Sequence, residues 1–415
     1  MISSSLAPHI LAVIALFFIA TISALGLKRI KIPYTIGLVI IGVIIAYIVK
    51  DIEALDAVRD IRLSHDVILY VLLPTLIFEA ATTIDAKMLF KNLMPILNLS
   101  IIGFVISTVI VGFVVFQFTP LQIGTAVLFG ALISATDPVA VVALFKEIGA
   151  PKRLCILVDG ESLFNDATAI VLFNIIVISI VSHLKFNLEN VLHGIVEFLI
   201  VFFGGILTGI IMGYIIVLII KLSKNDSIIN LALSTVLAYT SFIVAEYYFE
   251  VSGVMAVLAA GIMLSWHVLN NFTDQTKNQL HNFWEYASFV CNSFIFLLLG
   301  VAELHIIGLI GHSRSIIMYI IIAIIAASLA RLLVVYFIPR ILPFKNEKIN
   351  NSYKAIIFWG GLRGAVPLAL ALSLSRHFEN QQLIVELTLG VVLFTLIVQG
   401  TTINPLMKLL HIKRD

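Results

Sequence analysis

The chain has 415 residues, of which 60% are hydrophobic and only 12% are charged, and its formal net charge is +2. A water-soluble domain carries about 25% charged residues, so this composition excludes a soluble globular protein, and the small net charge gives no indication of nucleic-acid binding. Cys155 and Cys291 lie at apolar positions and indicate neither a disulfide framework nor a metal site. The composition therefore predicts an all-α integral membrane protein.

Thirteen stretches are apolar and long enough to cross a bilayer, since about 20 residues span a hydrocarbon core of ~30 Å. Their predicted centres, in chain order, are Leu16, Ile41, Leu73, Ser107, Leu132, Ala169, Leu207, Leu237, Ala260, Phe294, Ile324, Pro367 and Phe394. The first stretch has no basic residue before it and is longer than the apolar core of a signal peptide, so it is predicted to be a transmembrane helix.

Loop charges give the orientation. With the N-terminus outside, the cytoplasmic loops hold roughly three times as many Lys and Arg residues as the outer loops, which is the bias of the positive-inside rule. Only an odd number of spans keeps this alternation and leaves the C-terminus in the cytoplasm. We expect a multi-pass protein of the plasma or inner membrane.

Two features predict how the spans pack. Gly205, Gly209 and Gly213 repeat every four residues and favour close packing of the seventh span against a neighbour. The fifth and twelfth spans are polar and interrupted, and each is the middle member of a triplet, spans 4–6 and 11–13. Because the triplets are seven spans apart, they have opposite orientations, which predicts an inverted repeat.

Ionisable groups inside spans are costly and usually functional. In the sixth span, Ser162 and Asp166 lie one turn apart on one helix face, and Asp159 continues that face towards the cytoplasm. Glu161 and Asn165 form a neighbouring stripe. A hydroxyl beside a carboxylate offers hard oxygen ligands for a small cation, whereas a transition metal would need histidine or cysteine. A polar packing network between helices is the alternative explanation.

The fifth and twelfth spans carry residues that interrupt helices. Pro138 lacks an N–H and disfavours the helical conformation at Asp137, so carbonyl groups near Thr136 are expected to be available to an ion. Three glycines within residues 360–364 precede Pro367. Interrupted helices at matching repeat positions mark the substrate site of many secondary transporters, although each could be a simple proline kink.

Two arginines in the spans need anionic partners. An unpaired arginine in the membrane costs at least ~2.5 kcal/mol. We expect Glu161 to pair with Arg331 and Asp137 to pair with Arg363, and the exchanged assignment stays open. Asp166 and Glu79 are then the carboxylates that remain to meet an ion, with Asp166 at the centre of the site.

Three motifs together resemble a known family. They are Thr-Asp-Pro at 136–138, Gly-Glu-Ser-Leu-Phe-Asn-Asp at 160–166 and Gly-Gly-Leu-Arg-Gly-Ala-Val at 360–366, and Leu73-Pro74 precedes Glu79. The chain resembles, over its whole length, the first family of monovalent cation/proton antiporters, which holds microbial NhaP proteins and eukaryotic sodium/proton exchangers. The resemblance implies an NhaA-like antiporter fold with 13 transmembrane helices, in which spans 5 and 12 are unwound and cross.

The resemblance also implies a homodimer with two domains in each protomer. The dimerisation domain would comprise residues 1–85 and 187–310, which hold spans 1–3 and 7–10. The mobile core domain would comprise residues 86–186 and 311–415, which hold spans 4–6 and 11–13.

The ion ligands implied by the resemblance are Asp166, Ser162, Thr136 and Glu79, which would hold Na⁺. Asp159 stands where microbial relatives often carry glutamate, and we expect it at the cytoplasmic entrance. No cofactor is expected besides the transported ions.

The predicted function is antiport of Na⁺ or Li⁺ against H⁺, not an enzymatic reaction. A single carboxylate, Asp166, would bind a cation or a proton in competition, because Asn165 beside it is neutral. Exchange would then be electroneutral, one ion for one proton, with elevator-type alternating access. A K⁺/H⁺ antiporter of the same fold stays open, and a cation channel is a further alternative that would need a continuous pore.

Overall fold

The computed structural model describes residues 3–30, 34–49, 65–137, 142, 145, 151–182, 188–223, 226–302, 314–341, 351–375 and 378–410. Every regular element within these ranges is helical, and they contain no strand. The helices are α1 (Ser3–Ile30), α2 (Tyr34–Val49), α4 (His65–Val67), η2 (Ile68–Leu72), α5 (Leu73–Thr83), α6 (Ala86–Lys91), α7 (Leu93–Leu97), η3 (Asn98–Gly103), α8 (Phe104–Phe118), α9 (Ile123–Ser134), α11 (Lys152–Val181), α12 (Leu188–Ile220), η4 (Lys221–Ser223), α13 (Ser227–Ile243), η5 (Val244–Tyr248), α14 (Gly253–Asn271), α15 (Asp274–Ala302), α17 (Arg314–Ile341), α18 (Asn351–Trp359), α19 (Ala365–Ser373), α20 (Gln381–Phe394), η6 (Thr395–Gln399) and α21 (Gly400–Leu409). The η4 segment is a 3₁₀ turn, and η2, η3, η5 and η6 are π-helical.

Seven helical stretches of the described chain are long and apolar enough to cross a membrane, and four more apolar helices are shorter. The seven are Ile10–Leu27, Leu93–Phe118, Lys152–Val181, Leu192–Ile220, Ser227–Tyr248, Ser315–Phe337 and Gln381–Met407. The predicted all-α, multi-pass architecture is therefore confirmed. Every predicted span centre lies in a helix, and the count of 13 crossings stays a prediction.

Close packing at small residues joins α12 to α14, as the glycine repeat predicts. A Cβ atom on Gly205 or Gly209 would overlap the carbonyl oxygens of Ser252 and Ala256, and one on Gly213 would lie 3.0 Å from the Met263 Cβ. These contacts explain why the repeat consists of glycine, since any side chain would force the two helix backbones apart.

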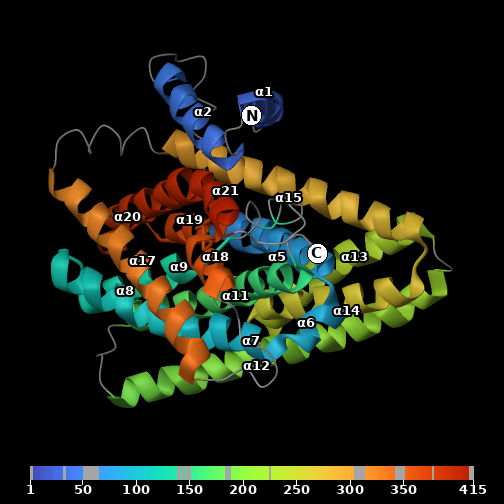
Figure 1. Cartoon of the computed structure of the whole chain (residues 1–415). Helices are drawn as coiled ribbons and strands as arrows, with labels where there is room; N and C mark the ends of the chain where they lie inside the picture. Colours follow the sequence, from blue (N-terminus) through green and yellow to red (C-terminus); the bar gives the residue numbers. More distant parts are fainter. Residues whose placement is uncertain are drawn as a thin grey trace.

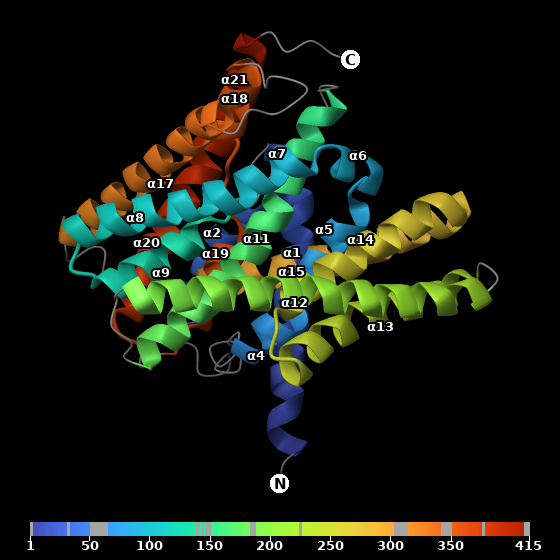
Figure 2. The ribbon, with the colours of Figure 1, turned by 90° about the horizontal axis from the view of Figure 1, so that it is seen from below.

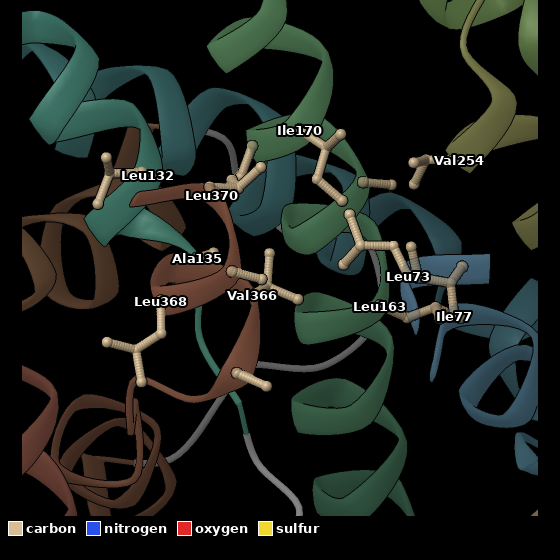
Figure 3. Packing of buried hydrophobic residues seen from close by; sticks show 14 of the residues in the cluster. Leu73, Ile77, Leu132, Ala135, Leu163, Ile170, Val254, Val366, Leu368 and Leu370 are labelled. Carbon is tan, nitrogen blue, oxygen red and sulfur yellow. The ribbon is translucent and has the colours of Figure 1, made fainter. Parts of the chain in front are cut away.

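Helix α11 lies in the middle of the bundle (Figures 1 and 2) and packs against α5, α9, α12, α14 and α19. Figure 3 shows its apolar side chains, among them Leu163 and Ile170, lying between α5 on one side and Val366 of α19 on the other. Helices α1 and α2 lie at one edge, against α15 (Figure 1). The polar residues of α11 are consequently enclosed by helices from both halves of the sequence.

Two helices end beside each other near the middle of α11. Helix α9 ends at Ser134, and residues 135–137 lie outside any helix; Pro138 lies outside the described residues. Residues 360–364 similarly separate α18 from α19. The Asp137 N–H donates a hydrogen bond of 2.7 Å to the Leu362 carbonyl. The two non-helical segments therefore lie in direct contact.

Candidate ion-binding site

The polar groups of α11 face the protein interior. Glu161, Ser162 and Asn165 are buried, whereas Asp159 and Asp166 are half-buried. A helix brings residues three and four apart onto one face, so the 161–166 segment presents its carboxylates, hydroxyl and amide as one cluster. Such groups are costly in an apolar interior unless they are hydrogen-bonded, and the partners of Glu161, Ser162 and Asn165 come from the non-helical segment after α9 and from α17.

Thr136 is held by the buried polar residues of α11. Asn165 Nδ2 donates to Thr136 Oγ1 at 2.7 Å, and the Thr136 N–H donates to Asn165 Oδ1 at 3.3 Å. Ser162 Oγ donates to the Thr136 carbonyl. The structure thus brings together two of the predicted ion ligands, Thr136 and Ser162. Ser162 lies one helical turn before Asp166 on α11. Asn165 acts as donor and acceptor at once, which an ionised carboxylate at this position could not do.

Arg331 of α17 forms a buried ion pair with Glu161, as predicted. Arg331 Nη1 donates to Glu161 Oε1 and Nη2 to Oε2, the latter at 3.0 Å. Arg331 Nε and Nη2 also donate to the Ile357 carbonyl, at 3.2 and 2.9 Å. A Cβ on Gly361 would lie 2.8 Å from Arg331 Nε, so glycine permits the guanidinium to approach the backbone.

Arg363 lies at the C-terminal end of α9. Its Nη1 donates to the carbonyl oxygens of Ser134 and Ala135, at 2.7 and 2.9 Å. The last carbonyls of a helix have no partner within the helix and carry its negative dipole end, so a cation is favourable there. The predicted pairing of Arg363 with Asp137 stays a prediction. The half-buried Asp137 carboxylate lies so close to Gly364 that a Cβ there would overlap it.

The remaining predicted residues, Glu79 and Asp159, lie on α5 and on α11. Glu79 is half-buried on α5, which packs against α11. Asp159 lies on α11 one turn before Ser162 and is half-buried. Whether Glu79 contacts the ion and whether Asp159 marks the cytoplasmic entrance stay predictions.

Sequence reasoning missed three polar groups around the cluster. Ser134 Oγ donates to Ser107 Oγ of α8 at 3.1 Å, and the Arg363 N–H donates to Thr395 Oγ1 of η6 at 3.1 Å. Gln399, also on η6, borders a cavity together with Arg363. Polar residues within otherwise apolar spans were the signal that could have indicated Ser107, Thr395 and Gln399.

Similarity to known proteins shows which family the chain belongs to. The family described as "Sodium/hydrogen exchanger, transmembrane" matches residues 13–409. The chain belongs to this family. Its members are secondary transporters and not enzymes. The structure of the sodium proton antiporter MjNhaP1 from Methanocaldococcus jannaschii at pH 8 is similar in fold, with a TM-score of 0.81 at 21% identity, and covers 98% of this chain and 100% of that one.

Two bacterial relatives are similar over nearly the whole chain. The Na(+)/H(+) antiporter NhaG of Bacillus atrophaeus is 37% identical over 405 residues, which are 96% of this chain and 75% of that protein. The Na(+)/H(+) antiporter ApNhaP of Aphanothece halophytica is 36% identical over 404 residues, with 96% and 73% covered.

Proposed function

We propose that this protein exchanges Na⁺ for H⁺ across the plasma or inner membrane, and that the two ions compete for Asp166. The observation that carries the proposal is the hydrogen-bonded cluster of Thr136, Ser162 and Asn165 directly beside this carboxylate. Membership of the sodium/hydrogen exchanger family and relatives named Na⁺/H⁺ antiporters support it.

The cluster supplies oxygen atoms suited to a small hard cation. The Asp166 carboxylate would provide the charge, and the Ser162 hydroxyl with the Thr136 hydroxyl and carbonyl would provide neutral ligands. Each of these oxygens keeps a lone pair beyond the hydrogen bond it now makes. Glu79, on the neighbouring α5, would complete the ligand set.

Competition explains coupling in this proposal. A protonated Asp166 is neutral and has no charge to balance Na⁺, whereas an ionised Asp166 with Na⁺ bound is also neutral overall. Either neutral form can cross apolar surroundings, but the empty, ionised form is costly to move there, which suppresses leak. Because Asn165 is an amide and Glu161 is paired with Arg331, one carboxylate trades one cation for one proton, and exchange is electroneutral.

Movement of a core domain would carry the ion. The core would comprise residues 86–186 and 311–415, moving as an elevator against a dimerisation domain of residues 1–85 and 187–310 in a homodimer. The 13 spans would form inverted repeats with the N-terminus outside and the C-terminus in the cytoplasm. Contact between the segments after α9 and after α18 supports crossing unwound helices at the centre of this core.

Flux in proteoliposomes tests the function. A pH dye trapped inside reports proton movement when Na⁺, Li⁺ or K⁺ is added outside, and we expect a response to Na⁺ and Li⁺. A valinomycin-imposed potential should leave the Na⁺ response unchanged. A response to K⁺ alone would assign a K⁺/H⁺ antiporter, and cation flux that moves no protons would indicate a channel.

A further inference from the structure

The non-helical segment of residues 360–364 is held at both ends by the last apolar helix of the described chain. Before the segment, Trp359 Nε1 donates to Thr402 Oγ1 of α21 at 2.8 Å. Within it, the Arg363 N–H donates to Thr395 Oγ1 at 3.1 Å. The π-helical turn η6, Thr395–Gln399, begins at the first of these threonines and ends before the second. Single π-helical turns inside α-helices occur frequently at functional sites.

The polar side chains of η6 border the two arginines of the site. Arg331, Arg363, Thr395 and Gln399 border one cavity between α17, α18 and η6. Thr395 and Gln399 are both buried, and Gln399 Oε1 accepts no hydrogen bond from the described residues. Burying a polar side chain costs free energy, whereas an apolar side chain would fill the same space without that cost. The presence of Thr395 and Gln399 here therefore suggests a role at the site.

A continuous chain of hydrogen bonds leads from η6 to the cation ligands. Thr395 accepts from the Arg363 N–H, and the adjacent Leu362 carbonyl accepts from the Asp137 N–H at 2.7 Å. Asp137 directly follows Thr136, which Asn165 and Ser162 of α11 bind. The Thr395 hydroxyl itself donates to the Val392 carbonyl at 3.0 Å, which fixes its lone pairs towards Arg363.

We propose that Thr395 is a positioning residue for the cation site. Its hydroxyl fixes the backbone at Arg363, and residues 360–364 transmit this constraint to Thr136 beside Asp166. Without the Thr395 acceptor, a buried N–H loses its partner, and the segment shifts to find another. The proposal rests on the Na⁺/H⁺ exchange proposed above, because the constraint matters only if the cation binds at Thr136 and Asp166.

Thr395→Val tests the proposal against a matched control. Thr388→Val makes the same change two turns earlier on α20, at a buried residue whose hydroxyl donates to the Ile384 carbonyl of its own helix. Purified protein is reconstituted in proteoliposomes, and Na⁺-driven proton flux is measured against Na⁺ concentration. We expect Thr395→Val to raise the apparent KM for Na⁺ about fivefold, with little change in maximal rate per folded protein.

Thr395→Ser keeps the acceptor and should retain the wild-type KM, as should Thr388→Val. Should Thr395→Val not fold, Thr395→Ala makes the same test with a smaller side chain. A wild-type KM in the variant that lacks the hydroxyl, or an equal shift in Thr388→Val, would overturn the proposal. Wild-type protein without Na⁺-driven flux would instead contradict the proposed function, and the two failures are thereby distinct.

Discussion

Arg331 and Glu161 are 170 positions apart in the sequence, yet they form a two-pronged ion pair in the middle of the helical bundle. Arg331 also donates twice to the Ile357 carbonyl, so one side chain joins α17 to both α11 and α18. The pair therefore fixes the helix that carries Asp166 relative to the segment that follows α18.

Removing one partner of this pair should destabilise the protein strongly. Glu161→Gln leaves the Arg331 guanidinium buried without its counter-ion, at a cost of about 3–5 kcal/mol. The double variant Glu161→Gln, Arg331→Gln removes both charges and should recover part of that loss. The measurement is the melting temperature and the yield of folded protein in detergent.

Asp274→Asn is the control for that series, because it breaks the exposed Lys277–Asp274 pair, whose atoms lie 3.4 Å apart at the surface. Exposed pairs contribute about 0–1 kcal/mol, so this variant should match the wild type. Additive losses in the double variant would show that Glu161 and Arg331 do not stabilise each other.

Gly209→Ala should destabilise the contact between α12 and α14. Its Cβ would overlap the Ala256 carbonyl, and overpacking of this kind costs about 1–3 kcal/mol. Gly194→Ala lies on the same helix, where an added Cβ meets no atom within 4 Å, and should be neutral or stabilising because alanine favours helices. Equal melting temperatures for the two variants would contradict this packing.

Much of the site could be predicted from sequence because charged groups inside apolar spans are rare. Asp166, Glu161 and Arg331 stand out by this rule alone, and the ion pair followed from the need to neutralise a buried arginine. The role of Arg363 could not be predicted, since its partners are carbonyls exposed only where α9 ends. Thr395 was missed because a threonine in a helix usually bonds to its own backbone, and its contact with Arg363 depends on tertiary packing.

Acidic pH should inhibit transport by competition. Protons occupy Asp166 as the pH falls, so more Na⁺ is needed to fill the same fraction of sites, while a saturating Na⁺ concentration restores the rate. In the range where Asp166 is mostly protonated, each lower pH unit should raise the apparent KM about tenfold. Initial rates at several pH values check this. A falling maximal rate with constant KM would indicate that the proton acts at another group.

Thiol labelling tests the orientation. In a background with Cys155→Ala and Cys291→Ala, Ser3→Cys should react with an impermeant maleimide from outside intact cells. Lys413→Cys, in the segment beyond the described residues, should react only after the cells are broken. Labelling in the reverse pattern would place the N-terminus in the cytoplasm.

Exchange by Asp166→Asn protein is the most direct test of the central claim, that one carboxylate binds cation and proton in turn. The amide neither takes up the proton nor balances Na⁺, so Na⁺-driven proton flux in proteoliposomes should vanish while the melting temperature stays close to that of the wild type. Glu386→Gln, which neutralises a buried carboxylate outside the site whose Oε1 accepts from Gln382 at 3.1 Å, should retain exchange. Wild-type flux in folded Asp166→Asn protein would contradict the account, because the proton and the cation would then bind elsewhere.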